Sequence, residues 1–372
     1  MNQVTPETTI GELCGYEEFK PLSNYFFTNM TEDVWNRPLD YYGFEKCGFA
    51  ETLERIKALI LTGQTLIYPV YQGDADKESV KLIFMPPEPS VPPEPSVSPE
   101  PSVPPEPSMP PEPSISSVPT NHTSGKPYVL ICPGGAYARQ WGLIEGLAMG
   151  TRMNRLGYPA FVLYYRTAQN PPFDRPLMPK PIEDLAAAIR LIEGRAEVFG
   201  VRAGDYAVAG FSAGAHLAAE WGTVNHGFAG YGLKGPAALL LGYPSISTDL
   251  FLDMAEEAGR NKQEADVSYL KRLGGSSLTR ESLREYSIDY HMDRNYPPVY
   301  VTACKDDPIV PVGCSFCLIE RLKELGIPYE ANIAEHGGHS FGLGNGTEVD
   351  GWPEQAAGFW QQMMMEQAGT GK

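Results

Sequence analysis

Basic residues and long apolar runs are both scarce in this sequence of 372 residues. Lys and Arg number 29 against 46 Asp and Glu, which gives a net charge of −17. Nucleic acids and anionic membrane surfaces attract basic patches, so this balance disfavours both as partners. No segment is long and apolar enough to span a bilayer, and residues 1–6 lack the charged-then-apolar pattern of a signal peptide. We therefore expect a cytoplasmic protein that acts on a small molecule.

Cysteine is also sparse, with six residues in the whole chain. Free thiols are the usual state of cysteine in a reducing compartment. Cys132 and Cys304 fall in apolar runs that predict core strands. Cys314 and Cys317 lie three positions apart, but the sequence offers no further ligands that would complete a metal site with them. We predict no metal and no cofactor.

One short motif carries most of the functional information: Gly-Phe-Ser-Ala-Gly at residues 210–214. The apolar run 206–209 precedes it, and the helix-forming run 215–221 follows it. A Gly-x-Ser-x-Gly motif between a strand and a helix is typical of a nucleophile elbow, a sharp turn that holds a serine hydroxyl at the carboxyl edge of a sheet. The alternative is an ordinary strand-to-helix turn capped by serine. The flanking pattern favours the elbow, with Ser212 as the nucleophile.

An acid loop and a histidine loop follow in the chain order that such a nucleophile requires. One strand-like run ends just before Asp306 and Asp307, and a second ends just before His336 and His339. In a triad, the carboxylate orients the imidazole, and the imidazole takes the proton of the serine. The residues alone leave the choice within each pair open.

Two further histidines and one acid receive structural interpretations. His216 lies one turn beyond Ser212 on the same predicted helix, where a hydrogen-bonded structural role is favoured. His291 precedes the acid loop and is therefore too early in the chain order to be the base. Asp184 is predicted to pair with Arg166.

A glycine-rich loop upstream supplies the remaining part of a serine hydrolase. The β-rich run 128–132 ends in Pro-Gly-Gly-Ala-Tyr at 133–137. Backbone N–H groups in such a loop, together with that of the residue after the nucleophile, stabilise the oxyanion of a tetrahedral intermediate. We predict this role for the N–H groups of Gly135, Ala136 and Ala213. Taken alone, Pro-Gly-Gly would be an ordinary turn.

Together these segments resemble the α/β-hydrolase esterases that include acetyl-xylan-esterase-like and short-chain acetyl esterases. The resemblance covers about residues 127–345. It rests on Cys-Pro-Gly-Gly-Ala-Tyr at 132–137, Leu-Gly-Tyr-Pro-Ala-Phe-Val-Leu-Tyr-Tyr-Arg at 156–166, Pro-Ile-Glu-Asp-Leu-Ala-Ala-Ala-Ile at 181–189, Gly-Phe-Ser-Ala-Gly-Ala-His-Leu-Ala at 210–218, Asp-Pro-Ile-Val-Pro at 307–311 and Gly-His at 338–339.

The resemblance implies a serine carboxylesterase for short-chain acyl groups with the α/β-hydrolase fold, a doubly wound, mostly parallel sheet with helices on both faces. It also favours one residue in each open pair. The acid before Pro-x-Val-Pro is Asp307 and the histidine in register is His339, so the implied triad is Ser212, His339 and Asp307. The family usually has a third glycine where Ala136 stands and often one where Ser340 stands. Neither departure removes a catalytic group.

A proline-rich repeat separates two strand-like runs in the first third of the chain. The hexapeptide Pro-Pro-Glu-Pro-Ser-Val recurs about five times between residues 86 and 115. Such a sequence buries no core and completes no β ladder, so we predict polyproline II or disorder for an insertion over 85–120. Because strand-like runs at 79–84 and 128–132 flank it, we place it in a loop between two strands of one sheet. Its role is either a tolerated loop expansion, or a spacer or Pro-x-x-P ligand for a partner.

The segment 1–64 is predicted to be a helical extension, and 65–372 the hydrolase domain. Apolar positions at helical spacing predict a helix over 48–60. The runs 65–71 and 80–84 predict a strand pair at the start of the sheet. No chemically active pattern stands out in 1–64, which we interpret as packing over one end of the sheet or over the active site.

The remaining segments alternate between helix and strand, as in a doubly wound sheet. Helices are predicted over about 142–156 and 182–199, and strands over 160–165 and 237–244. The polar, helix-rich stretch 247–294 then precedes the acid strand. By analogy with the fold, we predict a lid or a substrate wall there.

The sequence says least about the substrate. Tyr137, Trp141 and Phe211 are candidates to stack against a sugar or an aromatic alcohol, although such residues pack cores more often. The lack of a signal pattern favours acetylated oligosaccharides inside the cell over polymeric xylan. Two other functions stay open: a serine peptidase, which uses the same triad, and a non-catalytic binding protein that recruits a partner through the proline repeat.

Overall fold

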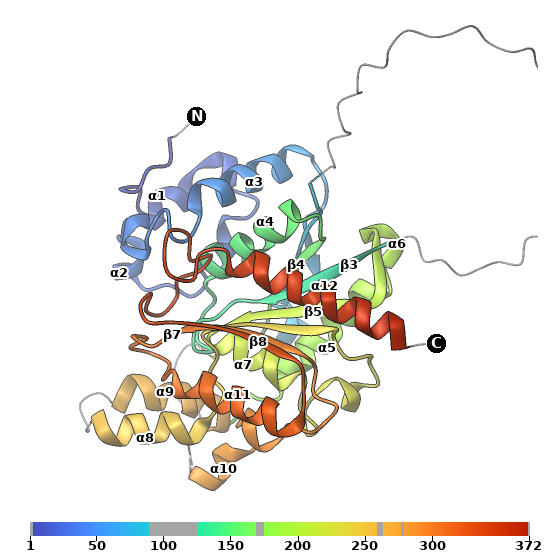
Figure 1. The fold of residues 1–372 in the computed structure, drawn as a ribbon. Coiled ribbons are helices and arrows are strands. Elements are labelled where there is room, and N and C mark those ends of the chain that lie inside the picture. The colour runs from blue at the N-terminus through green and yellow to red at the C-terminus, as the bar shows by residue number, and fades with distance from the viewer. Residues whose placement is uncertain (1–2, 89–124, 169–174, 259–262, 277–278, 371–372) are drawn as a thin grey trace, which may run out of the picture.

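A mostly parallel sheet crosses the centre of the protein (Figure 1). The computed structural model describes residues 3–88, 125–168, 175–258, 263–276 and 279–370, and in these ranges eight strands form the sheet in the order β1-β2-β4-β3-β5-β6-β7-β8. β2 is antiparallel to both of its neighbours. Six strands, β4, β3, β5, β6, β7 and β8 in sheet order, are parallel to one another. The strands are β1 (Ile67–Pro69), β2 (Lys81–Met85), β3 (Lys126–Cys132), β4 (Ala160–Tyr164), β5 (Val201–Phe211), β6 (Ala238–Gly242), β7 (Val299–Cys304) and β8 (Tyr329–Ala334). The predicted doubly wound α/β class is confirmed.

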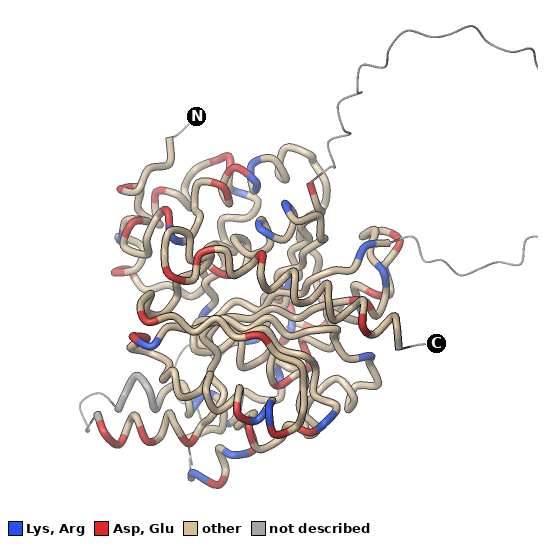
Figure 2. The backbone as a smooth tube through the Cα atoms, in the orientation of Figure 1, with Lys and Arg blue, Asp and Glu red and all other residues tan. Residues whose placement is uncertain are grey.

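Helices cover both faces of this sheet (Figure 1). One face carries α3 (Phe49–Leu61), α4 (Ala148–Arg155) and α12 (Trp352–Thr370), and the other carries α5 (Lys180–Glu193), α7 (Ala213–Glu220) and α11 (Gly313–Leu325). Successive strand residues point to opposite faces, so Leu130 of β3 joins one core and Ile131 joins the other. Because both faces are covered, the central strands are apolar at nearly every position. Figure 2 accordingly shows the charged residues mainly on the outer helices and loops.

The N-terminal segment shares a hydrophobic core with the sheet. It contains α1 (Ile10–Gly15), α2 (Glu32–Trp35) and α3. Thr9 and Glu12 form a capping box at the start of α1. Ile10 and Leu53 are buried in the same cluster as Ile131 of β3, so this segment is an added layer over the sheet.

A second group of helices lies between β6 and β7, over the stretch 247–294 that is predicted to form a lid or wall. It consists of α8 (Thr248–Ala258), α9 (Gln263–Gly274) and α10 (Arg280–Arg284), which Figure 1 shows at the end of the molecule opposite the N-terminal helices. Short 3₁₀ turns occur at Glu17–Phe19, Ser23–Tyr25, Leu39–Tyr42, Ala75–Lys77, Phe228–Tyr231 and Ile288–Tyr290. Within the described ranges, no helix combines the length and the apolar character needed to cross a bilayer.

Several local predictions can be compared with this fold. β1 and β2 form the strand pair predicted at 65–71 and 80–84, and this pair is antiparallel. β2 and β3 belong to one sheet as predicted, although β4 lies between them. Residues 89–124, which include most of the predicted proline-rich insertion, lie outside the described residues. The helix predicted over 142–156 begins with a π-helical turn at Gly142–Leu147, and the one predicted over 182–199 is divided into α5 and α6 (Ala196–Phe199).

A buried ion pair joins the end of β4 to α5. Asp184 is fully buried, and its carboxylate accepts hydrogen bonds from the backbone N–H of Arg166 at 2.8 Å, from Nε of Arg166 at 2.9 Å and from the hydroxyl of Tyr71 at 2.9 Å. The predicted Asp184–Arg166 pair is therefore confirmed. Cys132 and Cys304 are buried at the ends of β3 and β7, as predicted.

Candidate active site

Ser212 occupies a sharp turn between β5 and α7. Its backbone angles are φ 53° and ψ −120°, a conformation that costs a residue with a side chain about 1–3 kcal/mol. Its N–H donates to the carbonyl of Gly242 on β6 at 3.0 Å. A Cβ on Gly210 would lie 2.3 Å from the carbonyl oxygen of Gly214, and a Cβ on Gly214 would lie 2.1 Å from that of Cys132. The turn therefore requires glycine on both sides of the serine.

Ser212, His339 and Asp307 form a line of hydrogen bonds. Ser212 Oγ lies 3.0 Å from His339 Nε2, and His339 Nδ1 lies 2.6 Å from Asp307 Oδ2. Because an ionised carboxylate only accepts, Nδ1–H donates to Asp307, and Nε2 is left to accept the serine proton. The side chains of His339 and Asp307 are 11% and 2% exposed, so water competes little for these bonds. The structure thus brings together the three residues of the implied triad.

The two adjacent acids have separate partners. Asp307 Oδ1 accepts from the N–H groups of Ile309 at 2.8 Å and Val310 at 2.9 Å, which leaves Oδ2 for the imidazole. Asp306 instead accepts from the N–H of Gly338 at 2.8 Å. This backbone bond is the main cause that lowers the pKa of the Asp306 carboxyl. Asp306 therefore holds the backbone of the histidine loop.

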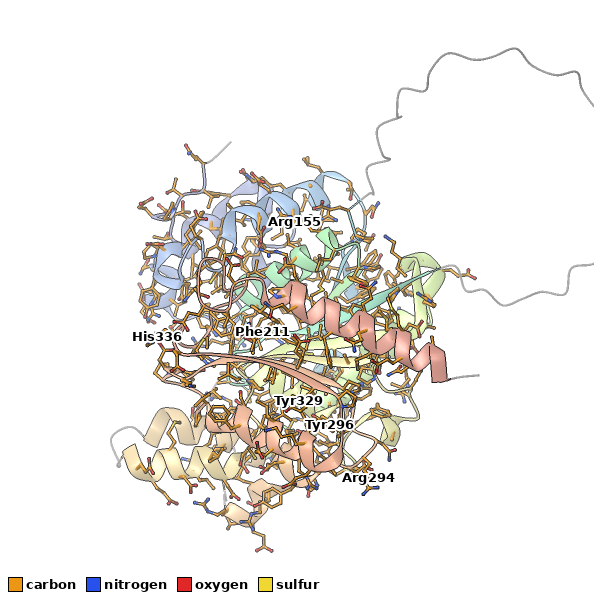
Figure 3. All side chains as sticks on the ribbon, in the orientation of Figure 1. Arg155, Phe211, Arg294, Tyr296, Tyr329 and His336 are labelled. Carbon is orange, nitrogen blue, oxygen red and sulfur yellow. The ribbon has the colours of Figure 1, made fainter. Side chains whose placement is uncertain are left out.

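The other candidate histidines are engaged elsewhere. His336 is 78% exposed, lies 3.5 Å from Asp306 and stands at the outer end of the loop after β8 (Figure 3). His216 is buried, with Nε2 2.7 Å from a backbone carbonyl and Nδ1 2.8 Å from the hydroxyl of Tyr137. The carbonyl can only accept, so Nε2 donates and Nδ1 accepts, and His216 has the structural role that was predicted. His291 lies 2.9 Å from the backbone carbonyl at the end of α10.

The loop after β3 places unbonded N–H groups beside Ser212. Gly135 and Ala136 have φ values of +133° and +53°, and both line the same cavity as the serine. Ala213 is the first residue of α7, a position whose N–H has no acceptor within the helix. Among the described residues, none accepts a hydrogen bond from these three N–H groups. Free backbone donors beside a nucleophile are what an oxyanion hole requires.

A buried carboxyl group, that of Glu145, lies beneath this loop, and no role was predicted for it from the sequence. Glu145 is fully buried in the π-helical turn. It accepts from the N–H of Gly134 at 2.5 Å and from the hydroxyl of Tyr243 at 3.0 Å, and the ring of Tyr243 packs edge-on against that of His339. Burial raises the pKa of Glu145 to about 7. The one signal in the sequence was a single acid within the apolar run 142–149.

Two of the three predicted substrate-stacking residues belong to the core, so that prediction is wrong for them. Tyr137 is fully buried, with its hydroxyl bonded to His216. Phe211 is also fully buried and packs against Trp352, the first residue of α12. Figure 3 labels Phe211 near the start of this helix. Alternation along β5 turns Phe211 toward the core covered by α12. Trp141 is half-buried and does line the cavity.

A cavity of about 380 Å³ opens over Ser212. The loop after β3, helix α9 and the histidine loop contribute its walls. It is lined by Gly135, Ala136, Ala138, Arg139, Trp141, Glu145, Ser212, Ser268, Arg272, Ile309, His339 and Ser340. The stretch predicted as a lid or wall thus reaches the site through α9.

Residues 25–29 of the N-terminal segment brace one wall of this cavity. The N–H of Leu143 donates to the carbonyl of Phe26 at 2.8 Å, and the N–H of Gln140 donates to the hydroxyl of Thr28 at 2.8 Å. The indole ring of Trp141 also packs edge-on against the ring of Phe27, with 5.8 Å between the ring centroids. The segment supplies no catalytic group but fixes the position of Trp141.

Comparison with known proteins agrees with this geometry. The BD-FAE family profile matches residues 117–322, which is more than half of the chain. The chain belongs to the BD-FAE family. Its relatives there are α/β-hydrolase esterases. The matched BD-FAE region includes Ser212 and Asp307 and ends before His339.

Individual relatives of this BD-FAE chain include a xylanase and an acetylxylan esterase. It is 30% identical over 230 residues to endo-1,4-beta-xylanase B of Butyrivibrio fibrisolvens, covering 60% of this chain and 34% of that protein. It is 26% identical over 242 residues to an acetylxylan esterase of Xylanibacter ruminicola, covering 64% of this chain and 45% of that protein. The chain thus spans less than half of the length of either relative.

Solved structures show the same fold. An acetyl ester-xyloside bifunctional hydrolase from Caldicellulosiruptor lactoaceticus aligns with a TM-score of 0.53 and 26% identity, over 66% of this chain and 85% of that one. The esterase Est2 of Thermogutta terrifontis, solved with propionate bound, aligns with a TM-score of 0.56 and 17% identity, over 80% and 93% of the two chains. The second likeness bears on the α/β-hydrolase fold alone.

Proposed function

We propose that this protein is a serine carboxylic-ester hydrolase that removes short acyl groups, acetyl in particular, from small esters. One observation carries the proposal: the line of hydrogen bonds from Ser212 Oγ through His339 to Asp307, at a nucleophile elbow and beside free backbone N–H groups. Membership of an esterase family and the likeness to an acetylxylan esterase support the same class of reaction.

In the proposed mechanism, His339 Nε2 takes the proton of Ser212 as the serine oxygen attacks the ester carbonyl carbon. Asp307 holds the Nδ1 proton and stabilises the imidazolium that forms. The N–H groups of the loop after β3 and of Ala213 bind the oxyanion. When the intermediate collapses, the alcohol leaves with the proton from His339 and the acyl group stays on Ser212. Water then attacks the acyl-serine by the same route and releases the carboxylic acid.

The cavity supports a small substrate. Its volume of about 380 Å³ lies near the lower end of the range for small-molecule sites. Ala136 places a methyl group beside Ser212, which narrows the space for the acyl group. Trp141 offers an aromatic surface to an alcohol such as a sugar ring. We therefore propose acetylated oligosaccharides as the natural class of substrate.

The test is hydrolysis of p-nitrophenyl esters from acetate to decanoate by the wild type and by Ser212→Ala. We expect acetate to be the best substrate and the variant to lose at least about 10³-fold in kcat while it stays folded. Ser340→Ala, which removes another serine hydroxyl from the same cavity, is the matched control and should lose about tenfold or less. Retained turnover in Ser212→Ala, or no turnover of any ester by the wild type, would contradict the proposal.

A further inference from the structure

Two guanidinium groups line the cavity that contains Ser212. Arg139 comes from the loop after β3, and Arg272 comes from α9, on a different wall. Arg272 is held in place, because its Nε donates to the carbonyl of Ala168 at 2.8 Å and its Nη1 donates to the hydroxyl of Ser268 at 2.9 Å. Two arginines, one of them fixed in position, therefore line the cavity of Ser212 from different walls.

The chain as a whole is acidic, with a net charge of −17. Elsewhere, Arg152, Arg166 and Arg280 each contact at least two carboxylates. In the described part of the chain, no Asp or Glu forms an ion pair with Arg139. Among the described residues Arg139 thus has no carboxylate partner, and it is placed to meet an anionic ligand in the cavity.

Glu145, the carboxyl group that lines the same cavity, forms no ion pair with Arg139. Glu145 is fully buried, and its two oxygens accept from the N–H of Gly134 and the hydroxyl of Tyr243. The two arginines also affect each other: burial and the positive charge of Arg139 lower the pKa of Arg272. A bound anion would relieve this repulsion.

We propose that the natural substrate carries an ionised carboxylate in addition to its ester, and that Arg139 and Arg272 bind this carboxylate. The inference rests on the proposed esterase function. A planar guanidinium matches a carboxylate through two parallel hydrogen bonds, which gives both affinity and orientation. The carboxylate belongs either to the acyl group, as in a monoester of a dicarboxylic acid, or to the alcohol, as in an acetylated sugar acid.

Matched pairs of esters distinguish these two sources. On the acyl side, 4-nitrophenyl hydrogen succinate is compared with its neutral methyl ester, 4-nitrophenyl methyl succinate. On the alcohol side, 4-acetoxybenzoate is compared with methyl 4-acetoxybenzoate. Within each pair the reacting ester is the same and the charge differs. We expect kcat/KM to favour the anionic member of one pair by at least about tenfold, and the preference to shrink as salt is added.

Variants of the two arginines then assign the preference to its residues. Arg139→Gln should abolish the ratio of anionic to neutral kcat/KM, and Arg139→Lys should retain part of it. Arg272→Gln should have the same effect as Arg139→Gln. Arg155→Gln is the matched control, because Arg155 pairs with Glu51 near the N-terminal helices, on the far side of the molecule from α9, and should leave the ratio unchanged (Figures 1 and 3).

The outcomes separate this inference from the proposed function. Hydrolysis of the neutral esters without a preference in either pair would overturn the carboxylate site and leave the esterase intact. A preference that persists in Arg139→Gln would also overturn it. Failure of the wild type to hydrolyse any of the four esters or p-nitrophenyl acetate would instead contradict the esterase function itself.

Discussion

Asp306 and Asp307 are adjacent in the chain, yet they support different parts of the same histidine loop. Asp307 Oδ2 lies 2.6 Å from Nδ1 of His339, whereas Asp306 Oδ1 accepts from the backbone N–H of Gly338 at 2.8 Å. One carboxylate orients the imidazole ring, and the other holds the backbone that carries this ring.

Replacing Asp307 should therefore cost far more activity than replacing Asp306. In Asp307→Asn the amide leaves the imidazolium without its counter-charge and permits the wrong tautomer, so we expect kcat to fall on the order of 10³- to 10⁴-fold. Asp306→Asn keeps an oxygen for the N–H of Gly338, and we expect a loss of about tenfold or less. Steady-state hydrolysis of p-nitrophenyl acetate measures both. Equal losses of kcat in the two variants would show that Asp306 and Asp307 do not have these separate roles.

The strained backbone of Ser212 predicts that glycine at this position gives a more stable protein than alanine does. Ser212→Ala and Ser212→Gly both lose the hydroxyl bond to His339, so their difference reports the backbone. Glycine reaches φ 53° and ψ −120° without strain, which stabilises the folded state by about 1–3 kcal/mol relative to alanine. Glycine also gives the unfolded chain more conformational freedom, which offsets about 0.4–1 kcal/mol of this gain. We expect Ser212→Gly to exceed Ser212→Ala by about 1 kcal/mol in the free energy of unfolding in urea. A less stable glycine variant would be inconsistent with strain at this turn.

Replacing each of two helical glycines, Gly214 and Gly358, by alanine should change the stability of the protein in opposite directions. In Gly214→Ala the new Cβ would meet the carbonyl oxygens of Cys132 at 2.1 Å and Pro133 at 2.5 Å, so α7 must move, at a cost of about 2–3 kcal/mol. Gly358 in α12 is exposed, and nothing lies within 4 Å of the added Cβ, so Gly358→Ala should stabilise the protein by about 0.5–1 kcal/mol. Denaturant unfolding of both variants tests the pair. A neutral Gly214→Ala would mean that the elbow tolerates a wider approach of α7.

Glu145 should make the protein less stable as pH rises toward neutrality. Its carboxyl ionises near pH 4.5 when the chain is unfolded and near pH 7 when it is folded, so the folded state binds the extra proton between these values. Stability from this group is fully present below pH 4.5 and is lost as the pH passes 7, by about 3 kcal/mol in total. Glu145→Gln keeps the shape without the ionisation. Unfolding curves at pH 5 and pH 8 should show a smaller fall in stability for this variant, and parallel behaviour of the two proteins would rule out the shift.

The parts of the site set by local sequence were predictable. The elbow depends on contacts of Gly210 and Gly214 within a few residues and at the neighbouring strand, so the motif together with its strand-like and helix-forming flanks predicted it. The position of Glu145 depends on contacts between distant segments. A Cβ on Gly142 would lie 2.0 Å from the carbonyl of Tyr25, which fixes the start of the π-helical turn. No periodicity in the sequence carries that information.

The misassigned aromatic residues have a related cause. Tyr137 and Phe211 stand next to catalytic motifs in the sequence, but nearness along the chain does not determine which way a side chain faces. Phe211 follows the alternation of β5 into the core under α12, and Tyr137 is drawn inward by its bond to His216. Trp141 reaches the cavity because the N-terminal segment packs behind it.

Residues 25–29, which brace this wall of the cavity, lie outside the stretch of the chain that matches the family. Ser212 and Asp307 lie within the stretch 117–322 that is common to the family, whereas Thr28 and the residues beside it lie outside that stretch. The residues that line the cavity lie mainly within the family stretch, and His339 and Ser340 lie beyond its end, so the N-terminal segment reaches the site through the wall that it supports. Substitutions in residues 25–29 would therefore move the wall beside Trp141 while Ser212, His339 and Asp307 keep their mutual contacts.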